Sequence, residues 1–143
     1  GLAGGRQMAP RSFDNERRAT QSRLHINFSH ANLEEGREGY LCIEQNDEVG
    51  IPGVVYDAGF VLAAYITQQR REILTPGKQV LELGCGCGIA GLAAALMLNN
   101  GDGGSVTLTD RNFDALELTS QNISANGLQS KVRTACYSFG GDP

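Results

Sequence analysis

An apolar strand, a turn of alternating glycines and an apolar helix follow one another without a break in residues 80–98. The strand reads Val-Leu-Glu-Leu at 80–83, the turn reads Gly-Cys-Gly-Cys-Gly at 84–88, and residues 89–98 have the apolar density of a buried helix. A strand, a glycine turn and a helix in this order form a nucleotide-type pocket at the carboxyl end of a parallel sheet. Glycines in the turn let the backbone approach a ligand closely, because a Cβ there would collide with it.

The acid inside this run, Glu82, limits the kind of ligand that the pocket can take. A site for a pyrophosphate presents backbone N–H groups and a helix N-terminus, with no acid facing the ligand. Glu82 therefore predicts a ligand that carries a positive charge. The alternative is a structural carboxylate on a buried strand, which is less favoured because an unpaired buried charge is costly.

Alternating strands and helices predict an α/β fold with a parallel sheet and right-handed crossovers. We expect Asp57 to cap its helix, with Phe60, Val61, Tyr65, Ile66 and Ile73 on one face, and Gly127 to end the last helix. The segment 46–53 is expected to be a loop, and 23–28 and 40–44 alternate as the strands of a hairpin. The strands of the parallel sheet are expected at 79–83, 105–109 and 131–137, and the helices at 57–74, 89–99 and 112–126.

The glycine turn resembles the first motif of the seven-strand (class I) S-adenosylmethionine-dependent methyltransferases, acid-x-Gly-x-Gly-x-Gly. Three further segments resemble the lysine-methyltransferase-like subgroup, methyltransferase family 16: Ile43-Glu44-Gln45, Tyr56-Asp57 and Tyr137-Ser138-Phe139-Gly140. The resemblance covers roughly residues 40 to 143. It implies a Rossmann-like class I methyltransferase fold, preceded here by a small N-terminal β-hairpin.

This resemblance implies S-adenosylmethionine as the cofactor. Glu82 would engage its amino group, Asp110 would accept hydrogen bonds from the ribose hydroxyls, Phe139 would stack on the adenine, and Ser138 would lie near the adenine amino group. Asp110 read by itself is also a candidate helix cap. The expected cofactor-binding residues are Tyr56, Glu82, Gly84, Cys85, Gly86, Gly88, Asp110 and Phe139.

Three aromatic or polar positions depart from the subgroup. The subgroup commonly has an acid where this chain has Ser138, and a Trp where it has Phe139 and Tyr56. A hydroxyl forms a weaker hydrogen bond than a carboxylate, so adenine binding is expected to be weaker or differently arranged. The motif that faces the acceptor in the lysine-directed subgroup would lie past Pro143, and no catalytic residue is assigned.

The strand order of the family predicts an incomplete sheet. That order is 3-2-1-4-5-7-6, and this chain holds the first three core strands, which leaves the strand at 79–83 as an edge. Exposed apolar strand edges are normally covered. We therefore expect the chain to be the amino-terminal half of a methyltransferase domain, residues 23–143 after a flexible leader at 1–22, with the missing half, a second copy or a partner at the edge.

Composition excludes several classes of function. A net charge of −4 argues against a nucleic-acid surface, and no apolar run reaches membrane-spanning length. Four cysteines without a secretory signal fit a reducing compartment, so a cytoplasmic protein is expected. The spacing of Cys85 and Cys87 is not that of a common zinc or redox pair, and these thiols are interpreted as small turn fillers with no metal.

The function that these observations favour is S-adenosylmethionine-dependent methylation of a protein, with lysine as the acceptor implied by the subgroup. Two rivals stay open. A dinucleotide-binding dehydrogenase would use Gly86-x-Gly88-x-x-Gly91, but this frame leaves Glu82 and Gly84 unexplained. A methyltransferase-like fold used as a non-catalytic structural or assembly component is compatible with Ser138 and the missing half.

Overall fold

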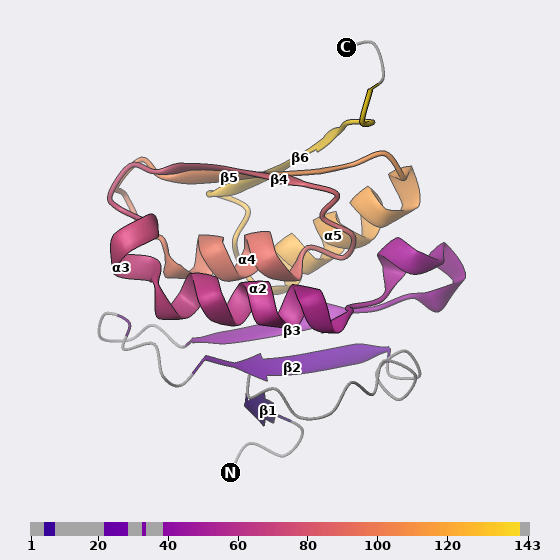
Figure 1. Cartoon of the computed structure of the whole chain (residues 1–143), viewed down its shortest axis with the longest axis horizontal. Helices are drawn as coiled ribbons and strands as arrows, with labels where there is room; N and C mark the ends of the chain where they lie inside the picture. Colours follow the sequence, from indigo (N-terminus) through magenta and orange to yellow (C-terminus); the bar gives the residue numbers. More distant parts are fainter. Residues whose placement is uncertain (1–4, 8–21, 29–32, 34–38, 141–143) are drawn as a thin grey trace.

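The computed structural model describes residues 5–7, 22–28, 33 and 39–140, which form three layers (Figure 1). A parallel sheet lies on one side, the helices form the middle layer, and a small second sheet lies beneath them. The strands are β1 (Gly5–Gln7), β2 (Arg23–Asn27), β3 (Tyr40–Glu44), β4 (Gln79–Leu83), β5 (Ser105–Asp110) and β6 (Val132–Cys136). The helices are α2 (Asp57–Gln68), α3 (Arg70–Ile73), α4 (Ile89–Met97) and α5 (Phe113–Ala125), with short 3-10 turns η1 (Asp47–Val49) and η2 (Ile51–Gly53).

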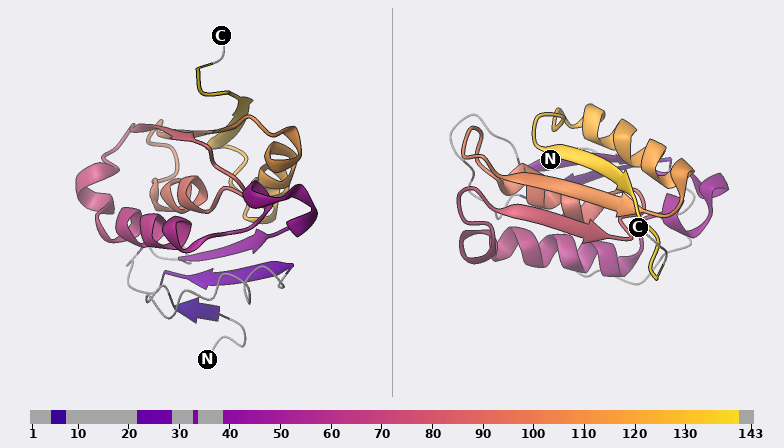
Figure 2. Two further views of the ribbon diagram at one scale, coloured as in Figure 1. Left: turned by 45° about the vertical axis from the view of Figure 1, so that its right-hand side comes forward. Right: turned by 90° about the horizontal axis from the view of Figure 1, so that it is seen from above.

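The larger sheet has the order β4-β5-β6, and both pairs of neighbours are parallel. Each strand is followed by a helix or reached from one, so the predicted α/β, Rossmann-like arrangement is confirmed for the strands present. Helices α2, α4 and α5 all lie on one face of this sheet, as Figure 2 shows from above. Leu92, Val106 and Leu108 are fully buried between α4 and the sheet.

The predicted hairpin is confirmed, and it belongs to a three-stranded sheet. Strands β2 and β3 are antiparallel, with Leu24 opposite Ile43 and Ile26 opposite Leu41, and all four side chains are buried. Strand β1 pairs in parallel with β2, inside the segment that lacks any strand periodicity and was predicted as a flexible leader. Residues 1–4 and 8–21 of that leader lie outside the described residues.

The predicted helix 57–74 differs from the structure in three ways. It is interrupted at Gln69, where α2 gives way to the single turn α3. Asp57 is the first helical residue, and Tyr56 holds the N-cap position without a side-chain cap. Ala63 and Thr67 are the buried residues of α2, whereas Val61 and Tyr65 are exposed. Phe60 and Ile66 of the predicted face do pack against the core, partly buried. The fully buried positions of α2 carry the short side chains of Ala63 and Thr67, which apolar periodicity does not single out.

Helix α5 begins and ends within a residue of the predicted bounds, with Asn112 as its N-cap, and Gly127 follows its end as predicted. The side chain of Asn112 accepts hydrogen bonds from the N–H groups of Asp114 and Ala115, and Gly127 takes a left-handed φ of 65° after the helix. The predicted loop 46–53 contains η1 and η2 and is closed by a hydrogen bond from the Asn46 N–H to the Gly53 carbonyl. Among the described helices, none combines the length and apolarity needed to cross a bilayer.

Strand β4 lies at the edge of the parallel sheet, as the family strand order predicts. Its outward-facing residues Leu81 and Leu83 are 63% and 51% exposed. Figure 1 shows no described helix over the outer face of this sheet. Parallel sheets are normally packed on both faces, so this edge and face form an unusually apolar surface.

The 143-residue chain by itself is expected to self-associate through this surface. Replacing Leu81 with Lys adds a charge at the exposed edge and is expected to shift the chain toward monomer in sedimentation velocity. The matched control is Gln68→Lys, which adds the same charge at an exposed position of α2. A wild-type chain that sediments as a well-folded monomer over the same concentration range would contradict the expectation.

Candidate functional site

An open cavity of about 640 Å³ lies at the carboxyl ends of β4 and β5, where α2, α4 and the η2 turn meet them. Ligand sites of α/β sheets occupy this position because the loops after the strands meet there. The described residues that line it are Ile51, Pro52, Val54, Val55, Tyr56, Ala58, Gly59, Leu62, Ile66, Val80, Leu81, Glu82, Leu83, Gly84, Cys85, Gly86, Cys87, Ile89, Ala90, Gly91, Ala94 and Asp110.

The glycine turn between β4 and α4 is built on left-handed backbone conformations. Gly84, Gly86 and Gly88 have φ values of 69°, 57° and 92°. Residues with a Cβ rarely adopt such values, which accounts for the alternation of glycine with another residue. A Cβ on Gly86 would also lie 3.0 Å from the Pro52 carbonyl oxygen, so η2 sits directly against the turn.

Hydrogen bonds from β5 hold the N–H groups on the strand side of the turn. The N–H of Cys85 donates to the Thr109 carbonyl at 2.8 Å, and the N–H of Gly86 donates to Asp110 Oδ2 at 3.0 Å. Two carbonyls of the turn are bound from the other side by helix α5. Thr119 Oγ1 donates to the Gly86 carbonyl at 2.6 Å, and Asn122 Nδ2 donates to the Cys87 carbonyl at 2.9 Å.

Sequence reasoning missed Thr119 and Asn122. Both side chains are fully buried although they are polar. Their spacing of three residues places them on the same face of α5, and a pair of polar residues on the buried side of a helix was the available signal.

The carboxylate of Glu82 lies beside the first turn of α4. A Cβ on Gly91 would lie 2.6 Å from Glu82 Oε2 and 2.0 Å from Leu108 Cδ2, so only glycine allows this close approach. The backbone N–H of Gly91 lies near this carboxylate and favours its charged form. The Oε2 atom is nonetheless buried without a hydrogen-bond partner among the described residues.

Burial raises the pKa of Glu82 from 4.5 to about 7. The backbone N–H of Gly91 opposes this rise, and the nearby charge of Asp110 adds to it. A buried carboxylate with an unpartnered oxygen and a second acid nearby is a site that favours a cation. The cationic ligand expected from the acid beside the glycine turn stays a prediction, and the buried carboxylate oxygen is where such a ligand would bind.

Asp110 lies at the cavity and also supports the start of α5, while its predicted contact with the ribose stays a prediction. It ends β5 and lines the cavity, and its Oδ1 accepts a hydrogen bond from the N–H of Asn112 at 2.9 Å. Since Asn112 is the N-cap of α5, Asp110 helps to start that helix while its Oδ2 holds Gly86. Each carboxylate oxygen has further lone pairs with which to accept ligand hydroxyl groups.

The structure brings most of the predicted cofactor-binding residues to one cavity. Tyr56 lines it from the start of α2, and Gly84, Cys85 and Gly86 line it from the turn. Glu82 and Asp110 line it as well, and two predicted residues, Gly88 and Phe139, do not. Gly88 packs against Thr119 and is outside the lining, and Phe139 is 70% exposed, with its Cζ 4.0 Å from where a Cβ of Gly84 would be.

Ser138 is exposed next to Phe139, whose ring meets that of Tyr137 edge to face at a centroid distance of 5.9 Å. These residues therefore form an open aromatic rim beyond Gly84.

The thiols of the turn are inert. Burial raises the pKa of both Cys85 and Cys87 to about 12, so both stay protonated near neutral pH. All four cysteines are free, and the described residues contain no group of three or more side chains able to hold a metal ion. The interpretation of these thiols as small turn fillers agrees with this environment.

Comparison with known proteins gives one family and several relatives. A family model described as lysine methyltransferase matches residues 36–142. Protein N-lysine methyltransferase METTL21A of Danio rerio is 36% identical over 95 residues, which cover 64% of this chain and 40% of that protein. EEF1A lysine methyltransferase 3 of Xenopus tropicalis is 40% identical over 101 residues, covering 71% and 42%. The chain thus spans about two fifths of the length of these relatives.

Replacing Glu82 with Gln is expected to stabilise the fold at alkaline pH. Folding raises the pKa of Glu82 from 4.5 to about 7, so the folded chain binds more protons than the unfolded chain between these values. Wild-type stability is then fullest below pH 4.5 and falls as pH rises through 7. The variant escapes this loss, which is on the order of 3 kcal/mol at pH 8.

Thermal unfolding of both proteins from pH 4 to 8 checks this expectation. The matched control is Glu72→Gln, which removes the same charge from an exposed residue of α3. A Glu82→Gln curve that runs parallel to the wild-type curve over the whole range would contradict it.

Proposed function

The chain belongs to the lysine methyltransferase family whose model matches residues 36–142, and from this premise we propose that the protein transfers a methyl group from S-adenosylmethionine to a lysine of another protein. The observation that carries the proposal is the buried, unpartnered Oε2 of Glu82 beside the glycine turn, at an open cavity that Asp110 also lines. S-adenosylmethionine carries a sulfonium and an ammonium group, which this carboxylate suits.

The residues present fit this cofactor. Glu82 would accept a hydrogen bond from the methionine ammonium, which would supply the partner that Oε2 lacks. A Cβ placed on Gly84 would meet only the Phe139 ring, at 4.0 Å, apart from its chain neighbours and among the described residues. Asp110 would accept hydrogen bonds from the ribose hydroxyls with the lone pairs that Gly86 and Asn112 leave free.

Two aromatic residues would complete the proposed cofactor-binding site. Tyr56 lines the cavity and would contact the cofactor from the α2 side. Phe139 would cover the adenine from the rim, and the neighbouring Ser138 would offer its hydroxyl to the adenine amino group. Since Ser138 is neutral, this contact would be weaker than one from a carboxylate.

When bound, the cofactor supplies an electrophilic methyl group with a good leaving group attached. The chain's contribution is then to bind and orient the donor, because an in-line displacement depends mainly on distance and alignment. Glu82 and Asp110 would fix its two ends from neighbouring strands. Catalytic residues for the acceptor lysine are not assigned within this chain.

A protein substrate is proposed because the relatives are named as methyltransferases of protein lysine and of EEF1A. The acidic net charge of −4 favours neither nucleic acid nor an anionic membrane as a partner. A cytoplasmic location stays a prediction from the four free thiols. The exposed edge of β4 is proposed to be covered by further sheet or by a partner.

Affinity for S-adenosylmethionine is expected to increase as pH rises from 5.5 to 7.5. The free site has a Glu82 pKa of about 7, and the carboxylate form binds the ammonium. Below that pKa the affinity should fall by up to about tenfold per pH unit, because a proton must leave before the cation binds. Glu82→Gln is expected to bind more weakly and to lose this pH dependence.

Isothermal titration in buffers of different ionisation enthalpy measures both the affinity and the released proton. Glu72→Gln is again the control and should behave as wild type. A preference of the wild-type chain for a nicotinamide dinucleotide over S-adenosylmethionine would reject the proposed cofactor.

Methyl transfer itself is tested with the protein that carries this chain, tritiated S-adenosylmethionine and a cell lysate. We expect labelled protein bands whose hydrolysate contains methylated lysine, and a strong loss of label with Asp110→Ala, which removes the proposed ribose contact. Cofactor binding without labelled bands would favour the non-catalytic alternative. Label on another amino acid would overturn lysine as the acceptor.

A further inference from the structure

Helix α5 and the residue after it present three polar side chains to the interior of the fold. Thr119, Asn122 and Asn126 are spaced by three and four residues, so they lie on one face of the helix. Thr119 and Asn122 are fully buried. Buried amides and hydroxyls are costly unless they are hydrogen-bonded, so the partners of these three side chains are informative.

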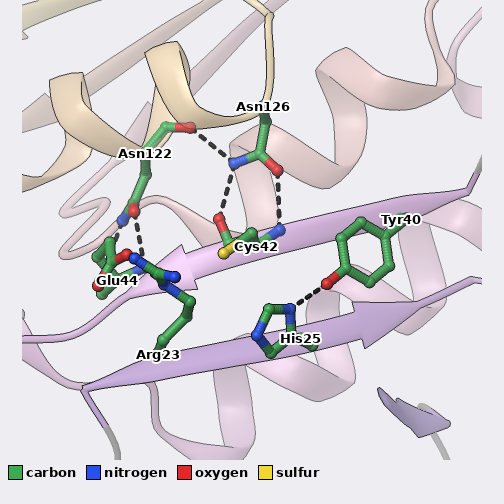
Figure 3. A network of polar contacts seen from close by, with 7 residues as sticks. All are labelled: Arg23, His25, Tyr40, Cys42, Glu44, Asn122 and Asn126. Carbon is green, nitrogen blue, oxygen red and sulfur yellow. Dashed lines mark hydrogen bonds and ion pairs between the residues drawn. The ribbon is translucent and has the colours of Figure 1, made fainter. Parts of the chain in front are cut away.

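One amide, that of Asn122, joins the hairpin to the glycine turn. Its Oδ1 accepts from the N–H of Glu44 at 2.7 Å, and its Nδ2 donates to the carbonyl of Glu44 at 3.1 Å (Figure 3). The same Nδ2 donates to the Cys87 carbonyl at 2.9 Å. Strand β3 and the turn are therefore held by a single side chain that has little freedom to move.

Thr119 holds the same turn one residue earlier. Its Oγ1 donates to the Gly86 carbonyl at 2.6 Å and lies 3.8 Å from the Cys85 sulfur. Its Cγ2 would be 3.1 Å from a Cβ on Gly88, so its methyl group packs against the end of the turn. Thr119 thus contacts the turn through both branches of its side chain.

Asn126 makes the same kind of contact with β3 without reaching the turn. Its amide accepts from the N–H of Cys42 at 2.8 Å and donates to the Cys42 carbonyl at 2.8 Å. Its third hydrogen bond goes to the Asn122 carbonyl at 2.7 Å. In the described structure it clamps the edge of β3 as Asn122 does, which makes it a natural internal control (Figure 3).

We propose that Thr119 and Asn122 are positioning residues for the cofactor turn, and that Asn122 couples the order of the turn to strand β3. This inference rests on the proposed function for its ligand, S-adenosylmethionine. The two side chains bind the carbonyls of Gly86 and Cys87 on the α5 side, and β5 binds the N–H groups of Cys85 and Gly86. The turn is in this way held in its left-handed path before any ligand arrives.

The first test needs no ligand. Hydrogen exchange of the Gly86 and Gly88 amides is measured in the wild-type chain and in Thr119→Val, Asn122→Ala and Asn126→Ala. Exchange is expected to accelerate about tenfold in Thr119→Val and Asn122→Ala, as for the loss of one hydrogen bond, and to change little in Asn126→Ala. Thr119→Ser keeps the hydroxyl and should restore the wild-type rate.

The second test measures affinity for S-adenosylmethionine by titration, together with melting temperature. Asn122→Ala and Asn126→Ala should lower the melting temperature by comparable amounts, because each variant loses two side-chain hydrogen bonds to the backbone of β3. Only Asn122→Ala and Thr119→Val should lose affinity, by about tenfold, with rescue in Thr119→Ser. If Asn122→Ala fails to fold, Thr119→Val and its rescue still decide the outcome. In the wild-type chain, ligand should slow exchange of the Glu44 amide.

Wild-type affinity in Thr119→Val would overturn the positioning role of Thr119, and wild-type affinity in a folded Asn122→Ala would overturn that of Asn122. An equal loss of affinity in Asn126→Ala would overturn the inference too, since the effect would then be general destabilisation. Unchanged exchange of the Glu44 amide on ligand binding would overturn the coupling to β3. A wild-type chain that does not bind S-adenosylmethionine, but shows the expected exchange pattern without ligand, would overturn the proposed function and leave the positioning of the turn established.

Discussion

The turn between β4 and α4 can exist only because other elements satisfy its backbone. Gly84, Gly86 and Gly88 have left-handed backbone conformations, so this segment cannot form the regular hydrogen bonds of a strand or helix. Its backbone N–H and carbonyl groups therefore need hydrogen-bond partners from other elements. Strand β5 supplies them through Thr109 and Asp110, and helix α5 supplies them through Thr119 and Asn122. The proposed binding site is therefore a product of the whole α/β arrangement, although the turn itself is short.

Electrostatics gives this turn its chemical character. Glu82 approaches the first turn of α4 because Gly91 has no side chain, and the N-terminus of this helix favours a negative charge there. Burial and the neighbouring carboxylate of Asp110 act in the other direction and raise the pKa of Glu82 to about 7. A buried carboxylate is stabilised more by a cationic ligand than an exposed carboxylate would be. The reason is that burial has already removed water from the charged group, and the ligand's positive charge offsets this desolvation cost.

Local sequence patterns predicted the positions of the strands and helices well, and predicted less well which of their side chains are buried. The strand, turn and helix of residues 79–97 form as expected because glycine spacing and apolar runs act over a few residues. The buried face of α2 was predicted only in part: Phe60 and Ile66 pack against the core, whereas nothing in the described part of the chain covers Val61 and Tyr65. Asn122 was missed because its polar side chain is buried, which is the opposite of what its residue type suggests. Its burial depends on a strand and a turn that are distant in sequence.

The cavity and the exposed edge of the sheet are one continuous surface. Val80 and Leu81 of β4 belong to the cavity lining together with the two acids, and so do Leu62 and Ile66 of α2. A chain that pairs with β4 must therefore also close the cavity from this side, and it removes more water from around Glu82. Further desolvation disfavours the charged carboxylate unless a cation accompanies it. Cover of the sheet edge and occupation of the site by a positively charged ligand are for this reason expected to reinforce each other through Glu82.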